Sequence, residues 1–204
     1  MGVRVRWRAL FLVLPVLAAV LSLSLAGCSS NESLAAQYRS GSDQGYIAGD
    51  GSVVEYAPAQ RGEPVTFEGT LANGHTVSSQ QYRGHVLVVN FWYAGCPPCR
   101  EEAPELEKLF QKYRNEGVDF LGVNLYDSAA TVQSFEADKS ITYPSVLDRD
   151  TGSVLLAFSK TVPPKSTPTT LVVDREGRVA ARILGALPGP GILDSFISDV
   201  LAEK

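Results

Sequence analysis

The sequence has few of the residues that build disulfide scaffolds and metal sites. Its 204 residues include three cysteines and two histidines, and its single methionine is Met1. Three cysteines are too few for a fold that disulfides hold together. The lack of internal methionine argues against a copper site, because thioether sulfur is a preferred ligand of Cu(I). The sequence therefore has to fold through an ordinary apolar core.

Positive charge is scarce as well. Lys and Arg number 18 against 22 Asp and Glu, which gives a net charge of −4. A nucleic-acid-binding domain normally carries a basic excess, so no nucleic-acid partner is expected. Apolar residues, in contrast, are abundant: 45% of the chain is hydrophobic. That content is enough for a core and excludes wholesale disorder.

The N-terminus has the parts of a secretory signal. Three arginines within the first eight residues precede an apolar run from Ala9 to about Ala26. The run ends in Leu25-Ala26-Gly27-Cys28, which resembles the bacterial lipobox. In that motif the chain is cut before the cysteine, which then carries lipid. The alternative is an uncleaved transmembrane anchor, because the run is nearly long enough to span a bilayer.

This interpretation divides the chain into three parts. Residues 1–27 are expected to be a signal peptide, and Cys28 is expected to anchor the protein in the lipid bilayer, on the extracytoplasmic face of the cell membrane. Residues 28–62 are rich in small and polar residues, which predicts a flexible tether. Apolar residues near the end of this segment could still dock on the domain, which is expected over residues 63–204.

One stretch carries the chemistry of the chain. The apolar run Val86–Trp92 predicts a buried strand, and a periodic segment over about 98–115 predicts a helix. Cys96 and Cys99 lie at the junction, where backbone N–H groups and the helix dipole favour negative charge. The pKa of Cys96 is therefore expected below the ~8.5 of a free thiol. Cys99 can attack a mixed disulfide on Cys96, so the pair predicts thiol–disulfide exchange.

The other patterns predict a hairpin, four strands and three helices. Asn73-Gly74 between two short extended runs is a strong hairpin signal. Their order predicts an α/β fold in which helices flank a mixed central sheet, with an added N-terminal hairpin. The expected strands are 118–125, 142–147, 169–174 and 179–184, and the expected helices are 131–139, 154–158 and 192–201.

Together these features resemble the thioredoxin fold, and within it the extracytoplasmic TlpA/ResA-like thiol–disulfide oxidoreductases. The matching motifs are Asn90-Phe91-Trp92 before the pair, Cys99-Arg100-Glu101-Glu102-Ala103-Pro104 after it, and Pro168-Thr169-Thr170 before a late strand. The resemblance extends from about Val65 to the C-terminus. It implies a membrane-tethered enzyme without a cofactor that reduces disulfides of client proteins, such as apocytochrome c before haem attachment. A membrane electron donor would resupply the electrons.

The resemblance also implies roles for single residues. Glu102 lies on the same helix face as Cys99 and is implied as the proton acceptor for its thiol, although an acid in this turn could simply complement the helix dipole. Pro168 is implied as a cis-proline that faces the cysteines and leaves the Thr167 backbone to pair with a client strand. Trp92 is expected in the active-site wall, where it could contact a client.

Two positions depart from the family pattern. Many members have tryptophan directly before the first cysteine, and this chain has Gly95. The missing ring is expected to expose Cys96 and to loosen the selection of partners. Cytoplasmic thioredoxins carry a buried aspartate where this chain has Asn90. Because an amide does not take up a proton, proton transfer is expected to fall to Glu102.

Other functions of the cysteine pair are less consistent with the sequence. A closed zinc site needs four ligands, and His75 and His85 lack ligand-like spacing. An inert disulfide closing so short a loop adds little chain-entropy stabilisation. A peroxiredoxin needs a Thr-x-x-Cys-type site, whereas Tyr93 stands three residues before Cys96. An oxidase of secreted thiols, or a lipoprotein that binds metal or haem through the pair, remain alternatives.

Overall fold

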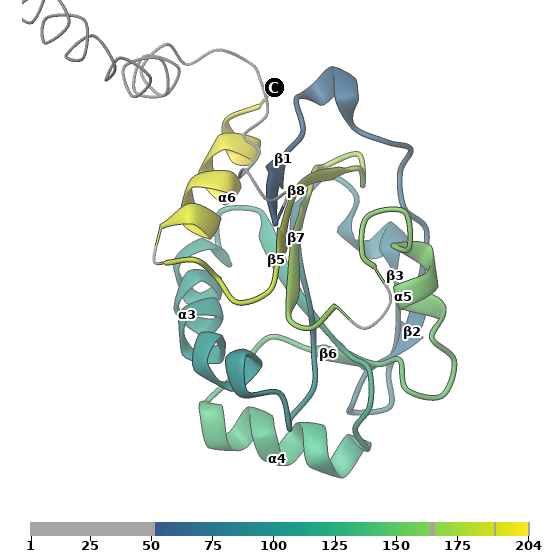
Figure 1. Cartoon of the computed structure of the whole chain (residues 1–204). Helices are drawn as coiled ribbons and strands as arrows, with labels where there is room; N and C mark the ends of the chain where they lie inside the picture. The colour runs from purple at the N-terminus through teal and green to yellow at the C-terminus, as the bar shows by residue number, and fades with distance from the viewer. Residues whose placement is uncertain (1–51, 164–165, 190, 204) are drawn as a thin grey trace, which may run out of the picture. The chain divides into compact units, whose positions relative to one another are not determined.

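The computed structural model describes residues 52–163, 166–189 and 191–203 (Figure 1). The predicted signal segment 1–27, Cys28 and the tether up to residue 51 lie outside the described residues. Within the described part of the chain, no helix combines the length and the apolar character needed to cross a membrane.

Six strands form the central sheet. They are β1 (Val53–Glu55), β4 (Val86–Trp92), β5 (Val118–Asn124), β6 (Ser145–Leu147), β7 (Thr169–Val173) and β8 (Val179–Leu184). Their order in the sheet is β1-β8-β7-β4-β5-β6. Strands β4, β5 and β6 run parallel to one another. Strand β7 runs antiparallel to β4, β8 antiparallel to β7, and β1 antiparallel to β8. The predicted mixed sheet is thereby confirmed.

Helices cover both faces of this sheet. They are α3 (Pro97–Tyr113), α4 (Ala129–Lys139), α5 (Ser153–Ala157) and α6 (Ile192–Ala202), with two short 3-10 helices, η1 (Pro58–Gln60) and η2 (Ser79–Tyr82). The predicted hairpin is formed by β2 (Glu68–Thr70) and β3 (Thr76–Ser78). In Figure 1, α3 and α6 lie on one face of the sheet, and α5 and the hairpin lie on the other. Helix α3 continues through Pro104.

The central strand β4 is buried along its whole length. Val86 and Val88 contribute to the core under α3 and α6, whereas Leu87, Val89 and Phe91 contribute to the core under the hairpin and α5. A strand that is covered on both faces needs apolar side chains at successive positions. This explains why residues 86–92 form a nearly continuous apolar run.

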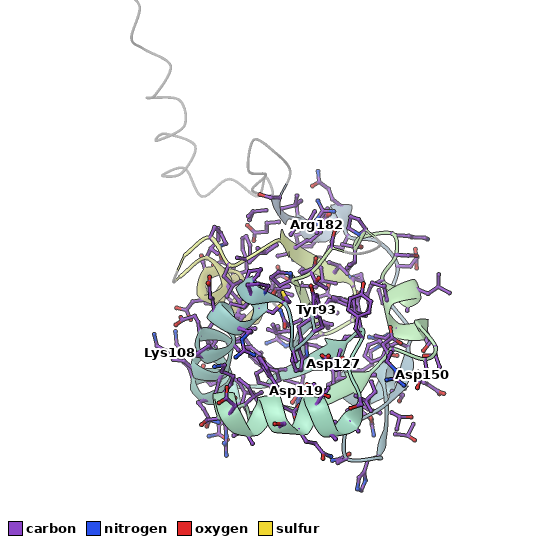
Figure 2. All side chains as sticks on the ribbon, turned by 60° about the horizontal axis from the view of Figure 1, so that its bottom comes forward. Tyr93, Lys108, Asp119, Asp127, Asp150 and Arg182 are labelled. Carbon is purple, nitrogen blue, oxygen red and sulfur yellow. A yellow bond between two sulfur atoms is a disulfide. The ribbon has the colours of Figure 1, made fainter. Side chains whose placement is uncertain are left out.

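The carboxyl ends of β4 and β5 meet at one end of the sheet. The two strands are parallel, with Trp92 paired to Asn124, so the segments that follow them leave the sheet side by side. In Figure 2, which turns this end forward, α4 lies in front, and Tyr93 and Asp127 are labelled beside it. The cysteine pair follows β4 and therefore lies at this end.

The sheet begins before Glu63, within residues 28–62, which were expected to form a flexible tether. Val53 pairs with Ile183, so β1 forms an edge strand beside β8. Arg61 then binds the carboxylates of Asp174 and Glu203. Part of the predicted tether is thus built into the fold.

Candidate active site

The cysteine pair lies where β4 ends and α3 begins. Cys96 is the N-cap of α3, and its Sγ accepts the Cys99 N–H at 3.2 Å. The two cysteines form a disulfide with a Cα–Cα distance of 5.3 Å. Pro97 occupies the first turn, where its missing N–H costs nothing. The structure thus confirms that a helix N-terminus donates to the sulfur of Cys96.

The expectation that Gly95 exposes Cys96 is wrong for this disulfide-bonded state. Cys96 is 2% exposed and Cys99 is 3% exposed. The Cys96 side chain is folded back onto the first turn of α3 by its bonds to Cys99, and it packs in a cluster with Trp92. A Cβ at Gly95 would instead lie 3.4 Å from the Tyr93 ring. A side chain at position 95 would therefore contact the Tyr93 ring from its Cβ onward.

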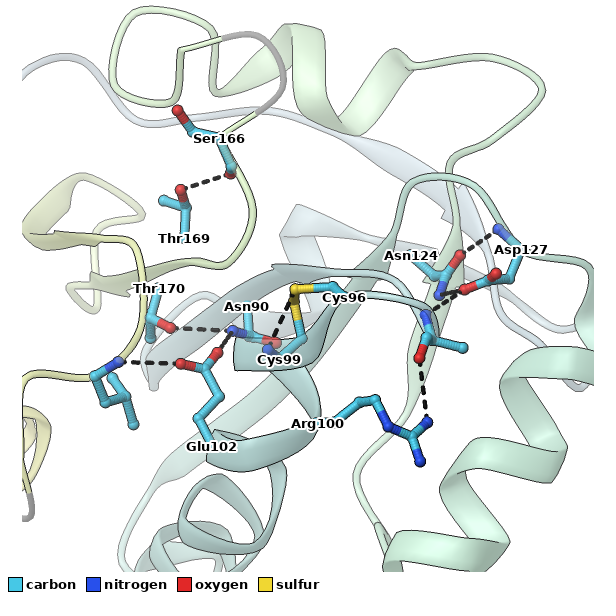
Figure 3. The surroundings of a disulfide bond; sticks show 12 residues. Asn90, Cys96, Cys99, Arg100, Glu102, Asn124, Asp127, Ser166, Thr169 and Thr170 are labelled. Atoms are coloured by element: carbon cyan, nitrogen blue, oxygen red, sulfur yellow. Dashed lines mark hydrogen bonds between the residues drawn. A yellow bond between two sulfur atoms is a disulfide. The ribbon is translucent and has the colours of Figure 1, made fainter.

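Glu102 and Asn90 form a buried polar network beside the disulfide (Figure 3). Asn90 Nδ2 donates to Glu102 Oε1 and to Thr170 Oγ1, each at 3.0 Å. The Leu187 N–H donates to Glu102 Oε2 at 3.1 Å. Burial raises the pKa of Glu102 to about 7, although these two hydrogen bonds to the carboxylate act in the opposite direction. A carboxyl group that titrates near neutral pH is suited to exchange protons with a thiol.

Pro168 lies at the start of β7, next to the end of β4. The Thr167–Pro168 peptide bond is cis, as the family resemblance implied. Phe91 of β4 pairs with Thr169, so the residues before Thr169 lie at the end of the sheet where β4 ends and the cysteine loop begins. Thr167 is half-buried there. The structure therefore brings Pro168 and Thr167 to the same end of the sheet as Cys96.

A clamp on the loop between β4 and α3 was not foreseen. Asp127 Oδ2 accepts the Ala94 N–H at 2.6 Å and Asn124 Nδ2 at 2.8 Å. Arg100 Nη1 donates to the Ala94 carbonyl oxygen at 3.2 Å, so Ala94 is held on both sides. The usable signal in the sequence was the position of Asn124 and Asp127. Asn124 is the last residue of a strand parallel to β4, and Asp127 follows that strand. Parallel strands have their carboxyl ends at the same end of the sheet, so these side chains lie near the cysteine loop.

Trp92 lies behind the cysteines. It is 5% exposed, and its ring centroid lies 4.5 Å from that of Phe135. Together with Cys99 it lines a small cavity of about 10 Å³. The structure places Trp92 in the wall of the site, as predicted, and leaves little of its surface for a client.

The histidines lie apart from this site. His75 is in the hairpin segment, and His85 Nδ1 lies 2.8 Å from Asp119 Oδ2. Among the described residues, no three or more His, Cys, Asp or Glu side chains are grouped so that they could hold a metal ion.

Comparison with known proteins places this geometry in a family. The Redoxin family matches residues 56–197. The chain belongs to the Redoxin family. It is 35% identical over 118 residues to the thiol-disulfide oxidoreductase ResA of Geobacillus kaustophilus, a match that covers 58% of this chain and 65% of that protein. It is also 30% identical over 115 residues to ResA of Bacillus subtilis, with 56% and 62% covered. The matched region thus spans less than two thirds of these relatives.

Solved structures of other proteins confirm the thioredoxin-like fold of this Redoxin-family chain. A DsbF homologue from Corynebacterium diphtheriae superposes with a TM-score of 0.66 at 27% identity, covering 76% of this chain and 98% of that one. A secreted thiol-disulfide isomerase from Corynebacterium glutamicum gives a TM-score of 0.68 at 27% identity, with 78% and 97% covered.

Proposed function

We propose that this protein is a thiol–disulfide oxidoreductase whose redox pair is Cys96 and Cys99. The observation that carries the proposal is the placement of the pair at the N-terminus of α3, with a helix N–H donated to the Cys96 sulfur. Such a position favours the thiolate, which is the nucleophile of disulfide exchange. The names of the ResA relatives describe the same activity.

The proposed direction is reduction of a client disulfide. The Cys96 thiolate attacks one client sulfur, forming a mixed disulfide and releasing the other client sulfur as a thiolate. Glu102 accepts the proton of the Cys99 thiol, and Cys99 then attacks Cys96. The second client sulfur leaves as a thiolate, and the enzyme's cysteine pair is left oxidised as the Cys96–Cys99 disulfide. Two electrons have passed to the client, and a membrane donor restores the dithiol.

The proposed client is a protein, with apocytochrome c as the candidate that the resemblance to ResA-like enzymes suggests. The segment before β7 supports a binding mode. The backbone of Thr167, held beside the cysteine loop by the adjacent Pro168, would pair with an extended client strand. Trp92 would support the back of the site.

The proposed location is the extracytoplasmic face of the membrane. In this proposal residues 1–27 are removed and lipid on Cys28 anchors the chain, so that the residues after it hold the domain off the bilayer. Cys28→Ser should abolish lipid attachment. Mass spectrometry of the N-terminal peptide and membrane fractionation would test this, and a mature chain without lipid that begins elsewhere would contradict it.

Trapping of client intermediates tests the roles of the two cysteines. Cys99→Ser should accumulate mixed disulfides on Cys96, because the group that resolves them is gone. Cys96→Ser should accumulate none, because the attacking group is gone. Non-reducing gels of cell extracts compare the two variants. Equal trapping by both variants would contradict the assignment.

The reduction potential distinguishes a reductase from an oxidase. A reductase should lie nearer the ~ −270 mV of thioredoxin than the ~ −120 mV of DsbA. One observation favours the oxidase: the N–H donated to Cys96 Sγ stabilises the thiolate, and with it the reduced form. The Glu102 carboxylate opposes this effect, because a nearby negative charge disfavours the thiolate. Glu102→Gln should therefore raise the potential in a glutathione titration. A parent value near that of DsbA would contradict the reductase.

A further inference from the structure

A small cavity lies next to Cys99, between α3, α4 and the sheet. Its volume is about 10 Å³, at the lower limit of the space that one water molecule needs. Its lining combines apolar groups from α3 and α4 with polar residues from the sheet and the loop before β6. The residues that matter for its chemistry are Cys99, Asn90, Tyr143 and Ser145.

One lining residue, Ser145, has a buried hydroxyl oxygen without a hydrogen-bond partner within the described part of the chain. The Oε1 atom of Glu136, in α4 next to the lining residue Phe135, is buried without a partner as well. Ser145 is 2% exposed. Burial raises the pKa of Glu136, and the nearby Ser145 hydroxyl acts in the opposite direction, although Ser145 Oγ and Glu136 Oε1 each lack a partner in hydrogen-bonding geometry. Leaving two such groups unpaired costs about 1–3 kcal/mol each, a cost that a bound water would remove by hydrogen bonding to them.

The sheet creates the room for these groups. Gly122 of β5 pairs with Ser145 of β6. A Cβ at Gly122 would lie 2.5 Å from Ser145 Oγ and 2.8 Å from Trp92 Nε1. The glycine therefore lets the serine hydroxyl and the indole nitrogen approach the strand beside the cavity.

We propose that this cavity holds one water molecule that takes the proton of the Cys99 thiol and passes it through the Ser145 hydroxyl to Glu136. Ser145 and Glu136 are relay residues that act through the water rather than on the sulfur. The proposal rests on the proposed thiol–disulfide exchange and adds a second proton exit beside Glu102. Glu136 is half-buried in α4, so the proton can continue to bulk solvent.

The Cys99 S–H bond breaks, and its proton moves to the water while a proton of that water moves to Ser145 Oγ. The original Ser145 hydroxyl proton goes to the Glu136 carboxylate. The Cys99 thiolate then forms the bond to Cys96 Sγ and expels the client sulfur, which accepts a proton from solvent.

Several titratable groups surround the relay. Cys99 and Tyr143 line the cavity itself, and Cys96 is bonded to Cys99. Glu102 is hydrogen-bonded to the lining residue Asn90, and Glu136 lies in α4 near Ser145. Burial raises the pKa of Tyr143 above its usual range, and so do the carboxylates of Glu102, Glu107 and Glu136. Tyr143 therefore stays protonated and does not compete for the proton.

The test separates the two cysteine steps with 5,5′-dithiobis(2-nitrobenzoate). The full chain is used in a Cys28→Ser background, so that Cys96 and Cys99 are its only thiols. One equivalent reacts with the reduced protein in a stopped-flow instrument. Attack by Cys96 releases the first thionitrobenzoate, and attack by Cys99 on the mixed disulfide releases the second. The second release reports deprotonation of Cys99.

Ser145→Ala and Glu136→Gln should each slow the second release about fivefold or more near pH 7, and they should leave the first release unchanged. This decrease in rate is smaller than the ~10²- to 10⁴-fold effect of removing a general base, because Glu102 remains as a parallel proton acceptor. The variants should reach the parent rate at alkaline pH, where hydroxide removes the proton. Matched controls are Ser134→Ala on the exposed side of α4 and Glu116→Gln beyond α3, both expected to behave as the parent.

Unchanged second-release rates in both relay variants would overturn the proposal. A slowing that is equal at every pH would also overturn it, because it would indicate a displaced Cys99 rather than a lost proton path. Glu136→Gln alters a half-buried residue, so it remains informative if Ser145→Ala folds poorly. Release of a single thionitrobenzoate by the parent would instead contradict the proposed exchange chemistry itself.

Discussion

At the residue scale, Glu102 shows how packing changes the chemistry of one side chain. Helix α3 places it three positions after Cys99, and the sheet and the loop before α6 cover it until 6% of its surface is exposed. Two hydrogen bonds are too few to replace the hydration of a carboxylate, so its pKa rises to about 7. Both the protonated and the ionised form of Glu102 are therefore populated near neutral pH.

This pKa predicts a dependence of stability on pH. A carboxyl group whose pKa is raised by folding stabilises the fold at low pH, and that contribution disappears as the pH rises through the folded pKa. From pH 5 to pH 8 the oxidised parent should lose about 2 to 3 kcal/mol of unfolding free energy through Glu102, at ~1.4 kcal/mol per pKa unit. Glu102→Gln should not show this loss. Urea unfolding of both proteins at several pH values measures the difference.

Glu101→Gln is the matched control, because Glu101 is the exposed neighbour on the same helix. It should keep the pH slope of the parent. Parallel pH profiles for the parent and Glu102→Gln would show that Glu102 has an ordinary pKa.

At the scale of elements, the loop between β4 and α3 depends on the end of β5. Asp127 accepts the Ala94 N–H, and Asn124 Oδ1 accepts the N–H of Asp127 at 2.8 Å, which orients the carboxylate. Hydrogen bonds to an ionised acceptor are stronger than neutral ones. The loop that presents Cys96 is therefore fixed by a neighbouring strand and not only by its own sequence.

Asp127→Ala should release this loop. We expect a loss of about 2 kcal/mol of stability, the usual size for a hydrogen bond to a charged group, and faster hydrogen exchange at the Ala94 amide by NMR. Asp127→Asn keeps an acceptor oxygen, so its stability and its exchange rate at Ala94 should lie between those of Asp127→Ala and the parent. Asp150→Ala removes an exposed carboxylate that pairs with Arg149 and should leave Ala94 unaffected. Unaltered exchange at Ala94 in Asp127→Ala would refute the clamp.

At the scale of the described domain, an ionic cluster joins the beginning of the fold to its end. Arg61 Nη1 lies 3.0 Å from Asp174 Oδ2 and also binds Glu203 after α6. The Arg61 side chain is 1% exposed. Asp174 in turn accepts Arg178 Nε at 2.9 Å, so the cluster also holds the turn between β7 and β8. Residues that precede the hairpin are thereby tied to the C-terminal helix.

Arg61→Met should destabilise the protein by about 3 kcal/mol, because it retains most of the side-chain volume but leaves a buried carboxylate without one partner. Arg149→Met removes an exposed pair and should change stability by less than ~1 kcal/mol. Thermal or urea unfolding compares the two variants. Equal stability of both would show that the cluster contributes nothing.

The sequence by itself determined the centre of this protein. The strand 86–92, the Cys96–Cys99 pair and the helix after it follow from patterns within a single stretch of chain, where periodicity and the strand-to-helix junction act locally. Asn90 also lies within this apolar strand, and its buried amide donates to Glu102 and Thr170, because a buried polar group needs hydrogen-bond partners. The hairpin was equally local, since Asn73-Gly74 specifies the turn without help from the rest of the fold.

The tertiary structure decided the surroundings of the pair. Leu187 donates to Glu102 across 85 positions, and Asp127 reaches Ala94 across 33. Such contacts depend on strand order and register, which no local pattern specifies. The same holds for β1, which became an edge strand because β8 offered it a partner, and for Ser145, which lies beside Gly122 only through the pairing of β5 with β6. The sequence determined the reacting atoms, and the packing of distant segments decided their burial and proton partners.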